Sequence, residues 1–352
     1  MCGECCCGAG GPEEPAKWVS GQLDTPVGRV PRVAARWTWR DWAGAWAVRW
    51  AFGRRSYAVP PGLYAVGDPS AASPLLATAN YKLSFDHVRR ALAGADAWVL
   101  VLDTKGVNVW CAAGKGTFGT EELVGRLGAS EVARLVGHRT LVVPQLGAPG
   151  VAAHEVARRT GFRVVYGPVR ACDIPAFLRA GLKATPAMRR VSFTLRERLA
   201  VVPVELAGRF LPAAGLALLF ASLSGLSRGG YLFDPRHALW AAALVTANYG
   251  AGIAVTPALL PWLPGRSFAV KGLATGAALG GLLAWLAPGG WLGRASVGLL
   301  SLAACSFLGL MFTGSTPYTS ASGVRRELAW ALPVQGALAL VGLTGWIAAR
   351  FV

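Results

Sequence analysis

The carboxyl-terminal part of the chain contains five long apolar segments separated by short polar stretches. They lie at residues 202–226, 238–262, 268–287, 291–313 and 328–349. Each is close to the roughly 20 residues that an α-helix needs to cross a bilayer. None shows the polar stripe of a helix in a soluble bundle. The pattern therefore predicts an α-helical transmembrane domain of about five helices over residues 202–352.

The preceding part alternates short apolar runs with helical stretches. Runs rich in β-branched residues predict strands at 75–79, 98–102, 140–144 and 163–166. Helical periodicity is found at 85–92, 121–127, 130–136, 150–160 and 174–180. This alternation is typical of a parallel sheet with crossover helices. It predicts a Rossmann-like α/β domain over 26–188, after a tail at 1–25 and before a basic linker at 189–201.

A segment rich in Trp and Arg, residues 30–64, precedes the first of these strands. It contains Trp37, Trp39, Trp42, Trp46 and Trp50. Trp is favoured in cores and at membrane interfaces. We expect this layer to pack on the α/β domain or at the membrane interface, with core packing preferred over a ligand role.

Composition supports a membrane protein with a soluble part, since 53% of residues are hydrophobic and 15% charged, with mean hydropathy +0.42. The net charge is +17, but the arginines are scattered and form no nucleic-acid reading motif, so we expect no nucleic-acid partner. More Lys and Arg flank one side of the spans than the other, which predicts a multi-pass protein of the cytoplasmic (inner) membrane with its soluble domain in the cytoplasm. The amino terminus lacks the basic and then apolar pattern of a signal peptide.

Seven cysteines in a cytoplasmic setting argue against a disulfide framework. Cys111, Cys172 and Cys305 are isolated, and we expect Cys305 to be a small buried hydrophobe and assign Cys172 no role. Four more lie in the tail: Cys2, Cys5, Cys6 and Cys7. The tail has no ferredoxin-type cysteine run or histidine pair, so its thiols suit a soft cation or have no role.

Cys111 lies in the stretch GVNVWCAAGK, residues 106–115, just after the predicted strand at 98–102. The small residues that follow it leave little bulk on a helix, so a large flat ligand can approach. Three further segments, 78–80, 145–150 and 167–170, also follow predicted strands. Because ligands gather at the carboxyl ends of parallel strands, the sequence predicts a cofactor site at that edge.

The residues NVWCAAGK at 108–115 resemble the cap-helix signature of the corrinoid protein family of mercury methylation. The resemblance extends to TANYKLSFD (78–86), VPQLGAPGVAAH (143–154), GPVRA (167–171) and FTGSTPYTSASG (312–323). It covers nearly the whole chain after about residue 25, including the membrane half, but not the first sixteen residues. This family is similar to the corrinoid iron–sulfur protein of acetyl-CoA synthesis.

The resemblance implies a cobalamin-type corrinoid with the Cys111 thiolate as lower axial cobalt ligand. Asn108, Val109 and Trp110 would fix the start of the cap helix. The corrin ring would find clearance at Ala112, Ala113 and Gly114, and Lys115 would contact its amide periphery. Thr78 and Asn80 would donate hydrogen bonds to the ring or its side chains. The cofactor's lower tail would be held by Gln145, Gly147, Gly150, Gly167 and Arg170.

The implied activity is transfer of a methyl group from cobalt to Hg(II), which gives methylmercury. Electron donation by the thiolate favours departure of the methyl group, by a carbanion or a radical route. The family's partners would be a ferredoxin-like protein with two [4Fe–4S] clusters and a methyltetrahydrofolate-dependent methyl donor system.

Two alternatives stay open at this point. The first is a corrinoid methyl carrier of one-carbon metabolism, against which Cys111 weighs because the acetyl-CoA pathway protein lacks a cysteine there. The second is a membrane transporter or sensor with a cytoplasmic domain. Its spans should carry buried charges along a path, but Glu205, Arg209 and Lys271 lie near span ends.

Overall fold

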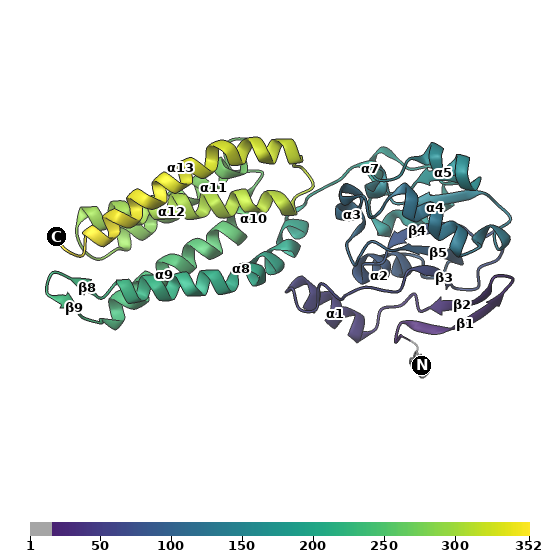
Figure 1. Cartoon of the computed structure of the whole chain (residues 1–352), viewed down its shortest axis with the longest axis horizontal. Coiled ribbons are helices and arrows are strands. Elements are labelled where there is room, and N and C mark those ends of the chain that lie inside the picture. Colours follow the sequence, from purple (N-terminus) through teal and green to yellow (C-terminus); the bar gives the residue numbers. More distant parts are fainter. Residues whose placement is uncertain (1–15) are drawn as a thin grey trace, which may run out of the picture. The chain divides into compact units, whose positions relative to one another are not determined.

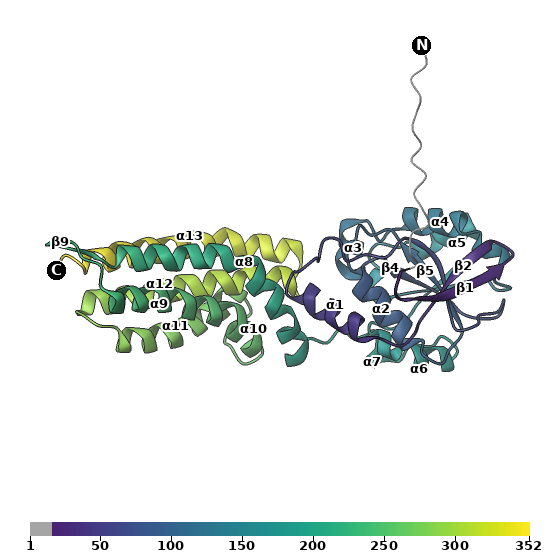
Figure 2. The same ribbon diagram turned by 90° about the horizontal axis from the view of Figure 1, so that it is seen from below.

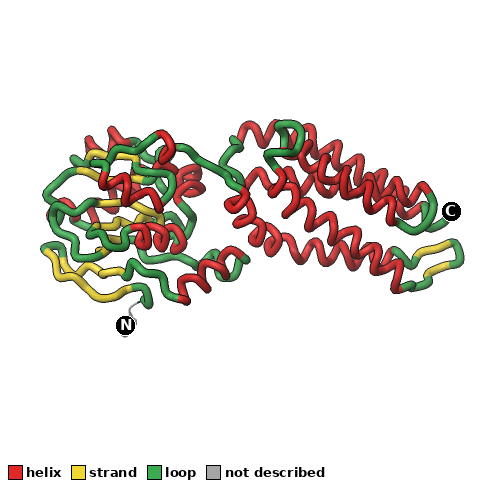
Figure 3. Tube along the Cα trace, turned by 180° about the vertical axis from the view of Figure 1, so that it is seen from behind, coloured by secondary structure: helices red, strands yellow, loops and turns green. Residues whose placement is uncertain are grey.

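The computed structural model describes residues 16–352. Contacts divide the chain into two units, one reaching residue 46 and continuing over 53–191, the other comprising 47–52 and 192–352. Strands and helices alternate in the first unit, whereas long helices fill the second (Figures 1 and 3). The cysteine-rich residues 2–7 lie outside the described part, so the soft-metal prediction for them stays a prediction.

The first unit is built on a seven-stranded mixed sheet. Its strands are β1 (Val19–Thr25), β2 (Gly28–Val33), β3 (Gly62–Val66), β4 (Leu75–Ala79), β5 (Ala97–Leu102), β6 (Thr140–Val143) and β7 (Arg163–Tyr166), in the order β1-β2-β3-β5-β4-β6-β7. The four predicted strands are confirmed as β4 to β7, and they pair in parallel. The other three extend the sheet, with β3 antiparallel to β5, so the complete sheet is mixed instead of parallel throughout.

Helices cover both faces of this sheet. They are α1 (Trp39–Arg49), α2 (Lys82–Ala91), α3 (Val109–Lys115), α4 (Thr120–Ala129), α5 (Ala153–Thr160), α6 (Ile174–Arg179) and α7 (Pro186–Arg189), with turns η1 (Val132–Arg134), η2 (Gln145–Gly147) and η3 (Ala171–Asp173). Alternation along β5 sends Trp98 and Leu100 into the core under α3 and α4, and Val99 into the core under α2 and α6. The helix predicted at 130–136 is only the 3-10 turn η1.

Helix α1 packs through one narrow face. Ala45 and Val48 are buried, whereas Trp39 and Trp42 are 73% and 53% exposed. The preferred expectation that this tryptophan layer packs in the core is therefore wrong for both residues. Position 39 lies opposite the buried Val48 on the helix, whereas Trp42 lies one turn from Ala45 but directs its ring to Trp37 and Arg90.

A buried ion cluster fastens α1 to α2. The Asp41 carboxylate accepts hydrogen bonds from Lys82 Nζ at 3.1 Å and from Arg89 Nη2 at 2.7 Å. Arg89 is fully buried and also donates to Asp86 at 2.8 Å. Burial raises the pKa of Asp41, but the Thr38 hydrogen bond and the two cations outweigh it and lower that pKa to about 2.

Asp41→Asn is expected to destabilise the first unit by about 3 kcal/mol at pH 7, because it leaves Arg89 buried with less compensating charge. A folded pKa below the usual 3.8 means that Asp41 stabilises the fold above about pH 4. This contribution is lost as the pH falls from 4 toward 2. Unfolding midpoints from pH 7 to pH 3 measure the effect, and Asp24→Asn, at an exposed ion pair with Arg29, is the control. Equal acid sensitivity of wild type and Asp41→Asn would contradict this account.

The second unit contains five helices long and apolar enough to cross a membrane, as predicted. They are α8 (Leu195–Leu223), α9 (Pro235–Gly250) continued by the π-helix η4 (Ala251–Val255) and α10 (Thr256–Leu259), α11 (Phe268–Leu286), α12 (Trp291–Met311) and α13 (Ala321–Ala348), with the 3-10 turn η5 (Phe312–Ser315). The helices run side by side in both views (Figures 1 and 2). A short hairpin, β8 (Leu226–Ser227) with β9 (Gly230–Tyr231), joins α8 to α9.

Small residues bring α11 and α12 together. A Cβ atom at Gly272 would lie 2.3 Å from the carbonyl oxygen of Cys305, and one at Gly276 would lie 2.6 Å from that of Ser301. Such close backbone approach is typical of packed helices in membranes. Glu205, in α8, is hydrogen-bonded to Arg209 and Ser315, so this charge is paired within the unit.

Candidate functional site

Helix α3 is a short helix at the carboxyl edge of the sheet. The Asn108 side chain caps it, with Oδ1 accepting from the backbone N–H of Cys111 at 3.0 Å. Gly116 ends it in the left-handed conformation, with φ +80°. These two caps fix the position of the Cys111 side chain on a helix of seven residues.

The two faces of α3 differ sharply. Val109, Ala112 and Ala113 are buried in the core of the domain. Cys111 is half-buried, while Gly114 and Lys115 are exposed. These last three positions follow the i, i+3, i+4 spacing of one helix face. The expected clearance at Ala112 and Ala113 is thus corrected, because both methyl groups face the protein interior.

Gly114 keeps the Cys111 face open. No protein atom lies within 4 Å of the Cβ position at Gly114. Trp110 is half-buried beside this face, and Lys115 supplies an exposed cation. A thiol, an open surface and a cation on one face are compatible with a large flat ligand that carries polar groups on its rim.

Asn80 holds the loop that leads into α3. Its Oδ1 accepts from the N–H and the hydroxyl of Thr104 at 3.1 and 2.8 Å and from the N–H of Gly106 at 2.9 Å. Its Nδ2 donates to Asp103 at 3.3 Å. The hydrogen bond from Lys105 lowers the pKa of the Asp103 carboxyl. Asn80 is therefore occupied by protein partners, in contrast to its expected role at the ring.

The hydroxyl of Thr78, in β4, is buried without a hydrogen-bond partner. Its side chain is 1% exposed, and its hydroxyl has no hydrogen-bond partner. Its strand neighbour Ala77 faces the core under α3, so alternation directs Thr78 to the opposite face of the sheet. A buried donor without a partner costs about 1–3 kcal/mol. The Thr78 hydroxyl therefore lies on the side of the sheet away from α3 and has no hydrogen-bond partner among the described residues.

Thr78→Val is expected to leave the protein alone as stable as wild type or about 1 kcal/mol more stable, because it removes an unsatisfied hydroxyl. If a bound cofactor accepts that hydrogen bond, its affinity should fall about tenfold. The matched control is Thr104→Val, whose buried hydroxyl donates to Asn80 at 2.8 Å and should therefore cost about 1–3 kcal/mol of stability. Unfolding midpoints and corrinoid titrations measure both, and unchanged affinity in Thr78→Val would remove Thr78 from the site.

The loop at 145–150 packs directly on α3. A Cβ at Gly150 would lie 2.1 Å from the Phe118 carbonyl oxygen and 3.2 Å from the Ala113 Cα atom. One at Gly147 would lie 2.5 Å from the Phe118 ring. Gln145 accepts a hydrogen bond from Arg189 at 3.0 Å. The two glycines thus serve the contact between this loop and the turn after α3.

Gly167 and Arg170 follow β7 at the same edge. Gly167 is buried, and its Cβ position lies 2.9 Å from Val142. Arg170 is exposed. The topology therefore gathers α3, the loop at 145–150 and the segment at 167–170 at one end of the parallel strands.

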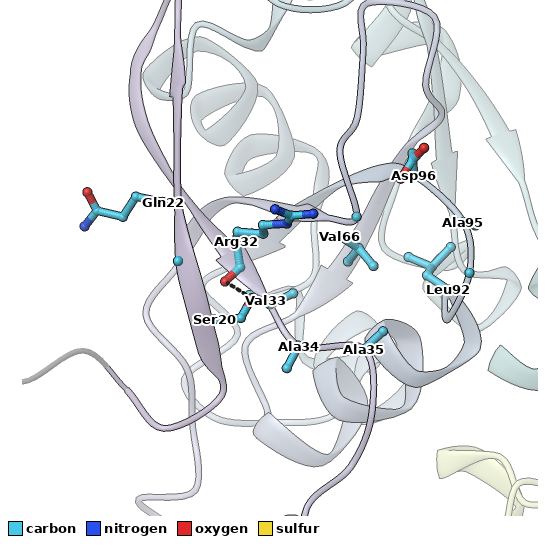
Figure 4. A pocket seen from close by; sticks show the side chains of 13 residues that line it. Ser20, Gln22, Arg32, Val33, Ala34, Ala35, Val66, Leu92, Ala95 and Asp96 are labelled. Carbon is cyan, nitrogen blue, oxygen red and sulfur yellow. Dashed lines mark hydrogen bonds between the residues drawn. The ribbon is translucent and has the colours of Figure 1, made fainter.

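A cleft of about 580 Å³ lies at the other end of the sheet (Figure 4). It is lined by Arg32, Val66, Leu92, Asp96 and their neighbours. Val66 pairs with Ala97 at the start of β5, whereas Cys111 follows the end of β5. This cleft is therefore separate from the Cys111 face.

These features define a class of protein: an α/β domain that presents a thiol on a short helix at the carboxyl edge of parallel strands. Residues 52–178 match the family model described as CO dehydrogenase/acetyl-CoA synthase delta subunit. The matched region spans β3 to β7 and α3, and ends before the five apolar helices.

Curated relatives point to the same group. The chain is 35% identical over 127 residues to the acetyl-CoA decarbonylase/synthase complex subunit gamma of Methanopyrus kandleri, which is 36% of this chain and 27% of that protein. It is 32% identical over 127 residues to the subunit gamma of Methanothermobacter thermautotrophicus, covering 36% and 27% of the two chains. The Archaeoglobus fulgidus subunit gamma is 33% identical over 122 residues, covering 34% and 26%. The chain thus spans about a quarter of the length of these relatives.

Proposed function

We propose that this chain is a membrane-anchored, corrinoid-dependent methyl-transfer protein. The observation that carries the proposal is the Cys111 thiol on the open face of α3, within the residues 52–178 that match the CO dehydrogenase/acetyl-CoA synthase delta subunit model. The open space at Gly114 supports the fit of a large polar-rimmed cofactor. When bound, a corrinoid supplies a cobalt centre that accepts and gives up a methyl group.

Each residue around α3 would make a different contact with this cofactor. Cys111 would hold the metal of the cofactor, since a soft thiolate is a strong donor to a transition metal. Asn108 holds the thiol in place through its cap. Gly114 would admit the ring, and Lys115 would contact its amide rim. The segments at 145–150 and 167–170 would hold the lower tail.

Two candidate functions differ in the molecule that accepts the methyl group. Methyl carriage in one-carbon metabolism is the one that the similarity to acetyl-CoA decarbonylase/synthase subunits favours. Methylation of Hg(II) is favoured by the motif at 108–115 and by Cys111 within it, on which the resemblance to the mercury-methylation family rests. We propose Hg(II) as the acceptor because electron donation from the Cys111 thiolate would favour transfer of the methyl group to a soft electrophile.

The partners follow from the same proposal. Re-reduction of the metal would use a ferredoxin-like protein with two [4Fe–4S] clusters, and methyl groups would come from a methyltetrahydrofolate-dependent system. The five apolar helices would anchor the protein in the cytoplasmic membrane with the α/β domain in the cytoplasm. The thiols of residues 2–7 would bind a soft cation such as Hg(II).

The test is a methyl-transfer assay with the full chain in lipid nanodiscs, loaded with a methylated corrinoid. One arm offers Hg(II) and measures methylmercury, and the other offers an acetyl-CoA decarbonylase/synthase and measures methyl transfer. Methylmercury formation supports the proposal. Transfer only in the second arm would replace it by the carrier function, and failure to bind corrinoid would overturn both.

A further inference from the structure

Helix α1 presents an unusual outer face. Trp39, Trp42 and Trp46 follow the i, i+3, i+7 spacing of one face and are 73%, 53% and 63% exposed. The inner face carries Ala45 and Val48, both buried. The largest apolar side chains of this helix therefore lie on its exposed face.

Arginines interleave with these rings. The guanidinium group of Arg40 lies 5.3 Å from the centre of the Trp39 ring, and that of Arg90 lies 5.0 Å from the Trp42 ring. Arg90 also lies 5.2 Å from the Trp37 ring, so it stands between two indoles. Each of these pairs joins a cation to an aromatic face.

The charge around α1 has one sign. Arg36, Arg40, Arg54 and Arg55 are exposed, while Asp41, the one acidic residue between positions 25 and 67, is buried in the ion cluster with Arg89. The segment with Arg54 and Arg55 leads to Tyr57, whose hydroxyl lies 2.5 Å from the Cβ position of Gly44. The outer face of α1 is thus aromatic and cationic, with no exposed acid within that stretch.

The short connection between the two units limits the distance between the α/β domain and a bilayer that α8 would span. Residues 192–194, counted with the second unit, join residue 191 of the first unit to Leu195, where α8 begins. Four Cα–Cα steps reach about 15 Å at most. If α8 spans a membrane, this connection keeps a surface of the α/β domain within reach of the lipid headgroups.

We propose that the outer face of α1 is this surface, a docking site for the headgroup layer of an anionic bilayer. Trp is favoured at the membrane interface because its ring is amphipathic, and clustered arginines attract anionic headgroups. The site, named here the Trp39 face, comprises Trp39, Arg40, Trp42 and Arg90. Its occupant is the lipid surface, and the inference requires only the membrane anchor, not the methyl-transfer chemistry.

The test is photocrosslinking of the full chain in nanodiscs. Trp39→benzoylphenylalanine places the reactive group on the proposed face, and Gln22→benzoylphenylalanine, at an exposed position of β1, is the matched control. Nanodiscs contain either a mixture of phosphatidylglycerol and phosphatidylcholine or phosphatidylcholine alone. Lipid adducts are quantified by mass spectrometry. Because Trp39 is 73% exposed, its replacement should leave the unfolding midpoint unchanged.

Lipid adducts at position 39 should exceed those at position 22 at least about fivefold in the anionic discs and fall at least about threefold without phosphatidylglycerol. Arg40→Glu combined with Arg90→Glu, which reverses the charge of the two arginines of the Trp39 face, should lower the yield in the same way. Equal yields at the two positions would overturn the proposal. Crosslinks at position 39 to protein in place of lipid would assign the face to a protein partner and would also overturn it.

Discussion

Replacement of Cys111 by alanine is expected to reduce methyl transfer at least about 100-fold while leaving the protein folded and in the membrane. Removal of an outer partner of a metal ligand already costs 10–100-fold, and this change removes the ligand itself. Cys111 is half-buried on the open side of α3, so alanine leaves no large cavity. The absorption spectrum of the full chain loaded with methylcobalamin should lose its cysteine-dependent shift.

Two matched variants control for the loss of a thiol. Cys172→Ala removes an exposed thiol in η3, and Cys305→Ala removes a buried one in α12. Both should keep the spectral shift and the methyl-transfer rate of the wild type. Full activity in Cys111→Ala would end the proposal that Cys111 holds the metal. Corrinoid binding without any shift in the wild type would favour a generic methyl carrier.

Strong local patterns predicted the central sheet and the membrane helices. The strand at 97–102 is buried at every position, and its unbroken apolar run marks it clearly. Strand β1 escaped prediction because it lies at the sheet edge, where most of its residues are exposed and its sequence VSGQLDT has no apolar run. The direction of β3 depends on its pairing with β5, which no local pattern encodes.

The sequence contains a signal for the start of the first apolar helix, which the predicted boundary at residue 202 does not take into account. Thr194 and Glu197 form a capping box, which begins α8 at Leu195, inside the range assigned to the basic linker. The spacing T-x-x-E before a helix is readable from sequence. The π-helix at 251–255 has no such signal, since it arises from packing around Gly252, whose Cβ position lies 2.6 Å from Leu308.

For the site, sequence identified which segments converge but not what each side chain contacts. Thr104 was missed, although it is fully buried and ties Asn80 to the loop before α3. Its place one residue after an Asp at a strand end, in DTKG, is typical of a turn that orders a following helix. Phe118 was also missed, because only the tertiary fold brings its ring against Gly147.

Gly150→Ala is expected to have the largest structural effect of any single methyl group at this edge. Its Cβ would lie 2.1 Å from the Phe118 carbonyl oxygen, a backbone atom that cannot rotate away. Overpacking of this kind costs about 3 kcal/mol or more, because the loop must move off α3. The variant should show a lowered unfolding midpoint and weaker corrinoid binding together, since the loop at 145–150 supports the helix that carries Cys111.

Gly114→Ala is the matched change on the open side of the same helix, where no atom lies within 4 Å of the Cβ. Alanine in a helix is about 1 kcal/mol more favourable than glycine, so the protein alone should keep or raise its unfolding midpoint. If a flat ring lies against this face, the added methyl group should weaken corrinoid binding at least about tenfold. Gly114→Ala should lose corrinoid binding but keep its stability, whereas Gly150→Ala should lose both. This pair of results would locate the cofactor on the Cys111 face. Unchanged binding in Gly114→Ala would mean that the ring lies elsewhere, because a bound plane in contact with α3 cannot accommodate the new methyl group without a shift.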